Sequence, residues 1–224
     1  MPMGKTTYKW LLLVMVGLSL ALMAYNWLDI PQHDYISLEE KATNPVNIRM
    51  IDSGIHMLQQ GDIVVRTGND ITSTMFLKMN QTDKTYSHCG IVMMENGYPF
   101  IYHSIGGEDN PNETLRRDSP LFWFSPRHNM GFGILRFNFT PAQADSLKHI
   151  VLQYYTAKKK FDFDFDLRDD RKLYCAEFVY NTLNYTMADT GFIKTTRWMG
   201  KEYVAIDNFT LNPHAHLICQ VRYK

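Results

Sequence analysis

The chain has 224 residues, with 23 Lys and Arg against 23 Asp and Glu, so its formal net charge is zero. That balance argues against a basic nucleic-acid-binding protein and against an acidic disordered tail, and no nucleic-acid partner is expected. Hydrophobic residues make up 45 % of the chain, enough for a buried core, and three cysteines are too few for a disulfide scaffold.

An uncharged apolar run occupies Trp10–Leu28. As a helix it would span about 28 Å, close to the hydrocarbon thickness of a bilayer. Lys5 and Lys9 precede it and acidic residues follow it. The positive-inside rule therefore predicts a cytoplasmic segment 1–9, a transmembrane anchor 10–28 and a catalytic domain outside the cytoplasm, periplasmic or extracellular. The alternative is a signal peptide cleaved near Ser19-Leu20-Ala21, which would make the protein secreted.

Residues 29–52 are mixed and polar and are predicted to form a stalk, with the globular domain at 53–224. A short helix is expected at 51–60, before the domain proper. Strands are predicted at 61–66, 87–94, 98–104 and 131–139, with a helix at 71–79 and a polar loop at 106–120. Asn96-Gly97 is the clearest hairpin turn in the chain.

The second half of the domain begins with a strong helix start at Thr140-Pro141-Ala142-Gln143, which predicts a capped helix to about Ala157. Phe and Asp alternate over 161–166, which predicts a strand with its phenylalanines inward rather than a calcium loop. A helix at 173–188 and strands at 203–206 and 217–223 follow. Because strands and helices mix without a βαβ rhythm, the predicted class is α+β, with a small antiparallel sheet packed on helices.

Three residues suggest nucleophilic catalysis. Cys175 is predicted at the start of a helix, where free N–H groups and the helix dipole stabilise a thiolate. His88 lies in a strand and would serve as general base. His103 lies in the paired strand, so the two imidazoles can share one face, and His103 would orient His88. Taken singly, each residue is more often structural than catalytic.

Two motifs together resemble a known family. They are a Gly-Asp-Ile strand followed by Ser-His-Cys-Gly-Ile, and the distant segment Tyr-Cys-Ala-Glu-Phe-Val. The pattern, from Gly61 to the C-terminus, is similar to the YiiX/YebB-like group, the circularly permuted branch of the NlpC-type papain-like cysteine hydrolases. The resemblance implies a permuted papain-like fold with Cys175 as nucleophile and His88 as base. His103 falls where the permuted group often has Glu.

Other residues are assigned more weakly. The resemblance matches Asp62 to the opening turn, and Tyr174 and Glu177 to the residues around the cysteine. These three residues and Arg66 are predicted to bind substrate. Glu177 is a substrate-pocket residue or, equally, a helix-start Glu favoured by the dipole. Arg66 could border the cleft. Cys89 is expected in the core, and its pairing with Cys219 is left open.

The predicted function is therefore a thiol hydrolase of amide or peptide bonds that works through a thioester on Cys175. By resemblance, its substrates would be cell-envelope peptides such as peptidoglycan stems, and no metal or organic cofactor is required. Two alternatives remain: acyl transfer or thioester chemistry on membrane lipids, because lecithin retinol acyltransferase-like proteins share the superfamily, and an inactive envelope-binding module.

Overall fold

The computed structural model describes residues 14–20, 37–107, 110–168, 170–198 and 200–224. The chain divides into two units, residues 1–37 and residues 38–224. In the first unit, residues 14–20 are helical. No helix within the described residues is both long and apolar enough to cross a membrane. Positions 10–13 and 21–28 of the predicted anchor lie outside the described residues, so the anchor stays a prediction.

The second unit is built on one six-stranded sheet in which every neighbouring pair of strands is antiparallel, with strand order β4-β3-β2-β1-β5-β8. The strands of this sheet are β1 Ile63–Gly68, β2 His88–Glu95, β3 Tyr98–His103, β4 Arg116–Asp118, β5 Asn129–Arg136 and β8 His216–Arg222. A separate hairpin pairs β6 Thr196–Trp198 with β7 Lys201–Tyr203. The antiparallel sheet predicted from the sequence is confirmed.

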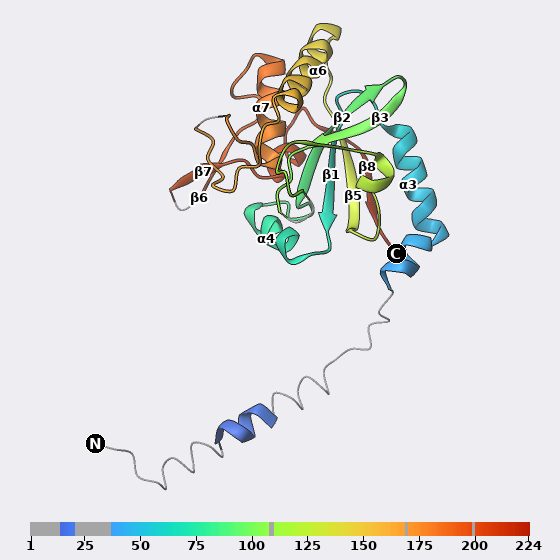
Figure 1. Ribbon diagram of the computed structural model, residues 1–224, viewed down its shortest axis with the longest axis vertical. Coiled ribbons are helices and arrows are strands. Elements are labelled where there is room, and N and C mark those ends of the chain that lie inside the picture. The colour runs from blue at the N-terminus through green and yellow to red at the C-terminus, as the bar shows by residue number, and fades with distance from the viewer. Residues whose placement is uncertain (1–13, 21–36, 108–109, 169, 199) are drawn as a thin grey trace, which may run out of the picture. The chain divides into compact units, whose positions relative to one another are not determined.

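Helices cover both faces of the sheet (Figure 1). The described helices of this unit are α2 Leu38–Thr43, α3 Pro45–Met57, α4 Ile71–Met79, α5 Pro120–Trp123, α6 Pro141–Thr156, α7 Cys175–Met187 and α8 Asp207–Thr210. Residues of α6 and α7 share one buried cluster with one sheet face, and residues of α3 and α5 share a second cluster with the other. The central strands β1 and β2 are buried on both faces, which explains their continuous apolar runs.

Local signals in the sequence account for several of these elements. Asn96 and Gly97 have φ of 50° and 85°, the left-handed conformation of a type I′ hairpin turn, and they join β2 to β3. Thr140 caps α6, and the side chain of Gln143 completes the capping box. The helices predicted at 71–79 and 140–157 are confirmed.

The Phe/Asp segment 161–166 is not a strand, and that prediction was wrong. The Asp162 carboxylate accepts the N–H groups of Asp164 and Asp166 at 2.9 and 2.7 Å, which folds the segment into a turn. Phe165 has a positive φ of 54°, and the side chain of Phe163 is 53 % exposed. Side-chain competition for backbone N–H groups therefore overrides the alternating pattern.

Other boundaries also differ from the prediction. The loop predicted at 106–120 contains the edge strand β4, and the late strand ends at Tyr203 instead of continuing to 206. Residues 38–52, predicted as stalk, form α2 and most of α3. Asn47 of α3 is buried and bonds the backbone of Lys41 and, at the other end of the chain, Lys224. These contacts make α3 part of the domain, which begins at Leu38 and not at 53.

Candidate active site

Cys175 is the first residue of α7, and its side chain lies in the buried cluster between α7 and the sheet. Tyr174 before it has an extended backbone, and the first helical hydrogen bond runs from the Phe178 N–H to the Tyr174 carbonyl at 2.9 Å. The sulfur therefore sits at a helix N-terminus, where the backbone N–H groups favour negative charge.

Two contacts hold the start of α7 beside the sheet. The Ser104 hydroxyl, directly after β3, donates to the Leu173 carbonyl at 2.5 Å. The Leu173 N–H in turn bonds the Lys160 carbonyl at 2.9 Å. Residues far apart in the chain thus position the nucleophile next to the strand that carries His103.

His88 opens β2 and is half-buried. Its neighbour Ser87 fixes the backbone there: the Ser87 N–H donates to the Arg66 carbonyl at 2.9 Å, and the Ser87 hydroxyl accepts the Gly68 N–H at 3.0 Å. The start of β2 is therefore hydrogen-bonded to the end of β1, which fixes the backbone position of His88.

His103 ends β3 and is fully buried. The hairpin register, continued by one pair, places it opposite Gly90, which is two residues along β2 from His88 and on the same face. A Cβ at Gly90 would lie 2.7 Å from the side chain of Ile101 and 3.1 Å from the Cβ of His103. The glycine in the Ser-His-Cys-Gly motif therefore leaves room for the second imidazole.

A hydrogen-bonded chain joins the two histidines to a carboxylate. His88 Nε2 lies 2.9 Å from His103 Nδ1, and His103 Nε2 lies 2.8 Å from Asp118 Oδ2. Because an ionised carboxylate only accepts, the proton on His103 belongs on Nε2, and His88 Nε2–H donates to His103 Nδ1. His88 Nδ1 is then the ring nitrogen left with a free lone pair.

Burial and hydrogen bonding set the protonation states of His88, His103 and Asp118. Burial lowers the pKa of both His88 and His103 from 6.5 to about 4, so both rings are neutral at pH 7. Burial acts to raise the pKa of Asp118, but hydrogen bonding from His103 and the Arg116 guanidinium at 2.8 Å outweigh it and hold that pKa below its ordinary value. Asp118 is therefore ionised and fixes the tautomers of both rings.

Cys175 interacts with His88 and with a second thiol, that of Cys89. A hydrogen bond from the Cys89 thiol is the largest cause that lowers the pKa of Cys175 well below its ordinary value, and the Ala176 N–H contributes to the same effect. Since His88 is neutral at pH 7, it can accept the Cys175 proton, and these two donors stabilise the thiolate that forms. Burial raises the pKa of Cys89 itself, which stays a thiol.

Arg66 and Trp123 complete the surroundings of the histidines. Trp123 is fully buried, with its ring centroid 5.1 Å from that of His88 and 4.7 Å from that of His103. Arg66, opposite His88 in the sheet, places its guanidinium 4.5 Å from the Trp123 ring. Its positive charge further disfavours protonation of both imidazoles.

The structure thus brings together Cys175, His88, His103 and Arg66 of the residues proposed from the sequence. Tyr174 and Glu177 adjoin Cys175 in the chain, but their polar groups make internal bonds. The Tyr174 hydroxyl donates to the Val204 carbonyl at 3.2 Å and accepts the Val204 N–H at 2.7 Å. The buried Glu177 carboxylate accepts the Tyr174 N–H at 3.3 Å, as a residue that caps a helix start does.

Asp62 lies apart from this group. It precedes β1, at the end of that strand opposite to Arg66, about 13 Å away at the rise of an extended strand. Its buried carboxylate forms a two-point ion pair with Arg136, at 2.7 and 2.8 Å, and accepts the Gln59 N–H at 2.7 Å. These contacts give Asp62 a structural role at the base of the sheet.

The cysteine pairing left open by the sequence does not occur, because Cys89 and Cys219 are both free thiols. Cys89 lies on β2 and Cys219 on β8, and β1 and β5 separate these strands. Three strand spacings amount to about 14 Å, beyond the reach of a disulfide. Cys89 is fully buried, as predicted.

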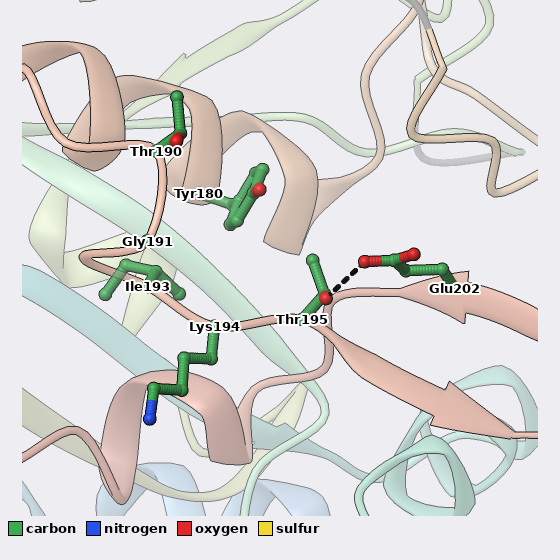
Figure 2. Close-up of a pocket in the computed structure, with 7 residues that line it drawn as sticks. All are labelled: Tyr180, Thr190, Gly191, Ile193, Lys194, Thr195 and Glu202. Atoms are coloured by element: carbon green, nitrogen blue, oxygen red, sulfur yellow. Dashed lines mark hydrogen bonds between the residues drawn. The ribbon is translucent and has the colours of Figure 1, made fainter.

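A surface depression of about 390 Å³ lies elsewhere, between α7, the segment that leads to β6, and Glu202 of β7 (Figure 2). It is lined by Tyr180, Thr190, Gly191, Ile193, Lys194, Thr195 and Glu202. Tyr180 follows Cys175 by five residues on α7, a rotation of about 140° around the helix. This depression contains neither the cysteine nor the histidines, and the Thr195 hydroxyl that lines it bonds the Glu202 carboxylate at 2.5 Å.

Sequence reasoning missed Asp118, Trp123 and the contact of Cys89 with Cys175. Asp118 sits in a segment that the sequence marks only as a polar loop, and its role depends on the pairing of β4 with β3. The sequence signal that could have found it is the short Arg-Arg-Asp run before Ser119-Pro120, a helix-start pattern that ends an edge strand.

Metal binding requires donor atoms that are free to converge on one point. No group of three or more His, Cys, Asp or Glu residues in the described part of the chain has such an arrangement. In the candidate site, the facing nitrogens of His88 and His103 are bonded to each other, and the second nitrogen of His103 is bonded to Asp118. These donors do not fit a metal ion in this arrangement.

Comparison with known proteins supports the fold alone. No protein-family model matches the chain, and no curated protein matches it. Among solved structures, the chain is similar to that of the metalloprotein YiiX from Escherichia coli O157:H7, with a TM-score of 0.60 and 17 % sequence identity. The match covers 73 % of this chain and 98 % of that chain. The domain therefore has a YiiX-like fold, as the sequence resemblance predicted.

Proposed function

We propose that the protein is a cysteine hydrolase of amide or peptide bonds. The observation that carries the proposal is the contact of Cys175, at the N-terminus of α7, with His88, whose other nitrogen is hydrogen-bonded through His103 to Asp118. A thiol nucleophile, an imidazole and an orienting acceptor are the parts that acyl transfer from an amide requires. The YiiX-like fold is compatible with this chemistry.

The mechanism follows from the hydrogen-bond chain. The Cys175 sulfur attacks the carbonyl carbon, and the N–H groups at the start of α7 stabilise the developing oxyanion. His88 Nδ1 takes the thiol proton and delivers it to the amine that leaves. While His88 is protonated, the Asp118 carboxylate stabilises its positive charge through the two hydrogen bonds that neutral His103 makes. Water then hydrolyses the thioester, with His88 as base.

Peptides of the cell envelope, such as peptidoglycan stems, are the proposed substrates. The test incubates the full chain with muropeptides and, in parallel, with phospholipid vesicles, with and without EDTA, and follows products by mass spectrometry. We expect cleavage of an amide bond in the muropeptides, loss of at least 1,000-fold in rate for Cys175→Ala, and no effect of EDTA. Cys219→Ala is the matched control because that thiol is remote from the histidines.

Three results would reject the proposal in different ways. Product formation from phospholipids alone would assign the same thioester chemistry to lipid acyl groups. Turnover that persists in Cys175→Ala would remove Cys175 as the nucleophile. A Cys175 that reacts with iodoacetamide no faster than an ordinary thiol at pH 7 would favour a binding module without catalysis.

We also propose that residues 10–28 hold the domain at a membrane, outside the cytoplasm. The support is the charge asymmetry around the apolar run. Intact mass of the mature protein from a membrane fraction tests this: retention of the N-terminal residues supports an anchor, and a mass that begins after Ala21 supports a cleaved signal.

A further inference from the structure

Cys89 stabilises the Cys175 thiolate, and its position also allows a reaction that amide hydrolysis does not use. It follows His88 on β2, its side chain is fully buried, and it belongs to the same cluster of packed side chains as Cys175. The two thiols are in hydrogen-bonding contact, although 86 residues separate them in the chain (175 − 89). A small hydrophobic side chain would fill this position without adding a second sulfur beside the first.

We propose that Cys89 is a resolving thiol, which forms a reversible intrachain disulfide with Cys175 when the protein meets a peroxide. A disulfide needs Cβ atoms about 3.5–4.5 Å apart, and two neighbouring thiols in one packed cluster can reach that distance through small shifts of their side chains. The proposal concerns the reactivity of Cys175, so it goes beyond the proposed hydrolase activity and does not depend on the substrate.

The two thiols differ in the way that this reaction needs. Cys175 has its pKa lowered, chiefly by the hydrogen bond from Cys89, so it supplies the thiolate that attacks peroxides. Cys89 has its pKa raised by burial, so it stays protonated until a sulfenic acid forms next to it. Cys219, on the edge strand β8, is too remote to resolve that intermediate.

The chemistry balances with hydrogen peroxide as the oxidant. The Cys175 thiolate attacks one oxygen, the O–O bond breaks, and Cys175 becomes a sulfenic acid with release of hydroxide. The Cys89 sulfur then attacks the Cys175 sulfur, the S–O bond breaks, and the departing hydroxide takes the Cys89 proton to form water. The hydroxide released in the first step takes up the proton that Cys175 lost when it ionised. Two thiols and one peroxide thus give one disulfide and two waters, and the disulfide protects Cys175 from further oxidation.

The experiment treats the full chain with hydrogen peroxide, blocks remaining thiols with iodoacetamide under denaturing conditions, and maps peptides without reduction. We expect a linked pair of peptides that contain Cys89 and Cys175, in the wild type and in Cys219→Ala. Before the denaturing step, labelling of Cys175 in the treated protein should be at least tenfold slower, and dithiothreitol should restore it. This readout needs no substrate, so it stands even where the hydrolase assay fails.

Cys89→Ser and Cys89→Ala are the deciding variants, and Ser is nearly isosteric in case Ala perturbs the core. In Cys89→Ser, whose hydroxyl can still donate to the thiolate, Cys175 should accumulate as a sulfenic acid that dimedone traps, and longer exposure should cause a loss that dithiothreitol does not reverse. Cys89→Ala should give the same products at a lower rate, because it lacks the donor that lowers the pKa of Cys175. The proposal is overturned by a wild type in which Cys175 oxidises without a Cys89-linked peptide, by a Cys175 inert to peroxide, or by Cys89→Ser recovering as the wild type does.

Discussion

Asp118 sets the proton arrangement of the site at the scale of single residues. Its carboxylate accepts a hydrogen bond from His103, which is in turn hydrogen-bonded to His88, and it forms an ion pair with Arg116. In Asp118→Asn, the amide can present its NH₂ group to His103 and so favour the wrong tautomer of both rings. We expect kcat to fall about tenfold or more with little change in KM, because the change affects proton transfer and not substrate contacts.

Steady-state kinetics on the amide substrate check this prediction. Asp145→Asn, the same change on the exposed surface of α6, is the matched control and should behave as the wild type. An unchanged kcat in Asp118→Asn would show that Asp118 has no role in proton transfer.

His103 also couples folding stability to pH. Burial lowers its pKa to about 4, whereas in the unfolded chain it is near 6.5. Between these values the unfolded state binds the proton and the folded state does not, so stability is full above pH 6.5 and is lost as the pH falls toward 4. The difference amounts to about 3 kcal/mol for this one group.

Urea unfolding between pH 4 and pH 7 measures that dependence. In His103→Gln, which does not titrate, the fall in unfolding free energy across this window should be smaller by a similar amount, even where the variant is less stable at every pH. Parallel pH profiles for the two proteins would show that His103 is not neutral in the folded state.

The histidines show what the sequence could predict at the residue scale. The Asn96-Gly97 turn defines a hairpin register, and that register puts His88 and His103 on one face before any coordinates are known. The partner of His103 could not be predicted in this way. Asp118 reaches it only because a three-residue edge strand pairs with β3, and such a short strand carries no periodicity that a sequence pattern can reveal.

At the scale of elements, the position of α7 depends on side chains that bond backbone groups across the fold. The sequence predicts the helix from its apolar spacing, but not the Tyr174 hydroxyl that bonds both polar backbone groups of Val204. The resemblance assigned Tyr174 to the substrate pocket. Its two internal bonds and its buried ring support a role in holding the start of α7 instead.

Tyr174→Phe separates these two roles. Removal of the hydroxyl leaves the buried Val204 N–H and carbonyl without that partner, which should lower the free energy of unfolding by about 1–3 kcal/mol. If Tyr174 does not touch substrate, KM should stay within about twofold of the wild type. Chemical denaturation and steady-state kinetics on the same preparation provide both numbers.

Tyr180→Phe, on the same helix, is the matched control for Tyr174→Phe because its ring is only half-buried. A large rise in KM with unchanged stability in Tyr174→Phe would return Tyr174 to the substrate pocket.

For the molecule as a whole, the polar composition of residues 29–52 predicted a stalk that ends at 52. A polar, proline-containing segment lacks the long apolar stripe that marks a core helix, yet α3 buries Ile51 and places Gly54 against the Phe132 ring. Its decisive contact joins Asn47 to the C-terminal residue Lys224. A contact between the two ends of a domain leaves no local trace in the sequence.

Two truncations therefore should behave differently. A chain of residues 38–224 keeps every element of the second unit, and we expect it to unfold in one cooperative transition. A chain of residues 53–224 loses α2 and most of α3, including the buried Ile51 and the bonds of Asn47 to Lys224. Loss of one buried aliphatic side chain and two or three hydrogen bonds should lower the free energy of unfolding by about 3–5 kcal/mol. Urea denaturation of both chains, followed by circular dichroism, measures the difference; equal midpoints would place α2 and α3 outside the cooperative domain and restore the boundary at 53.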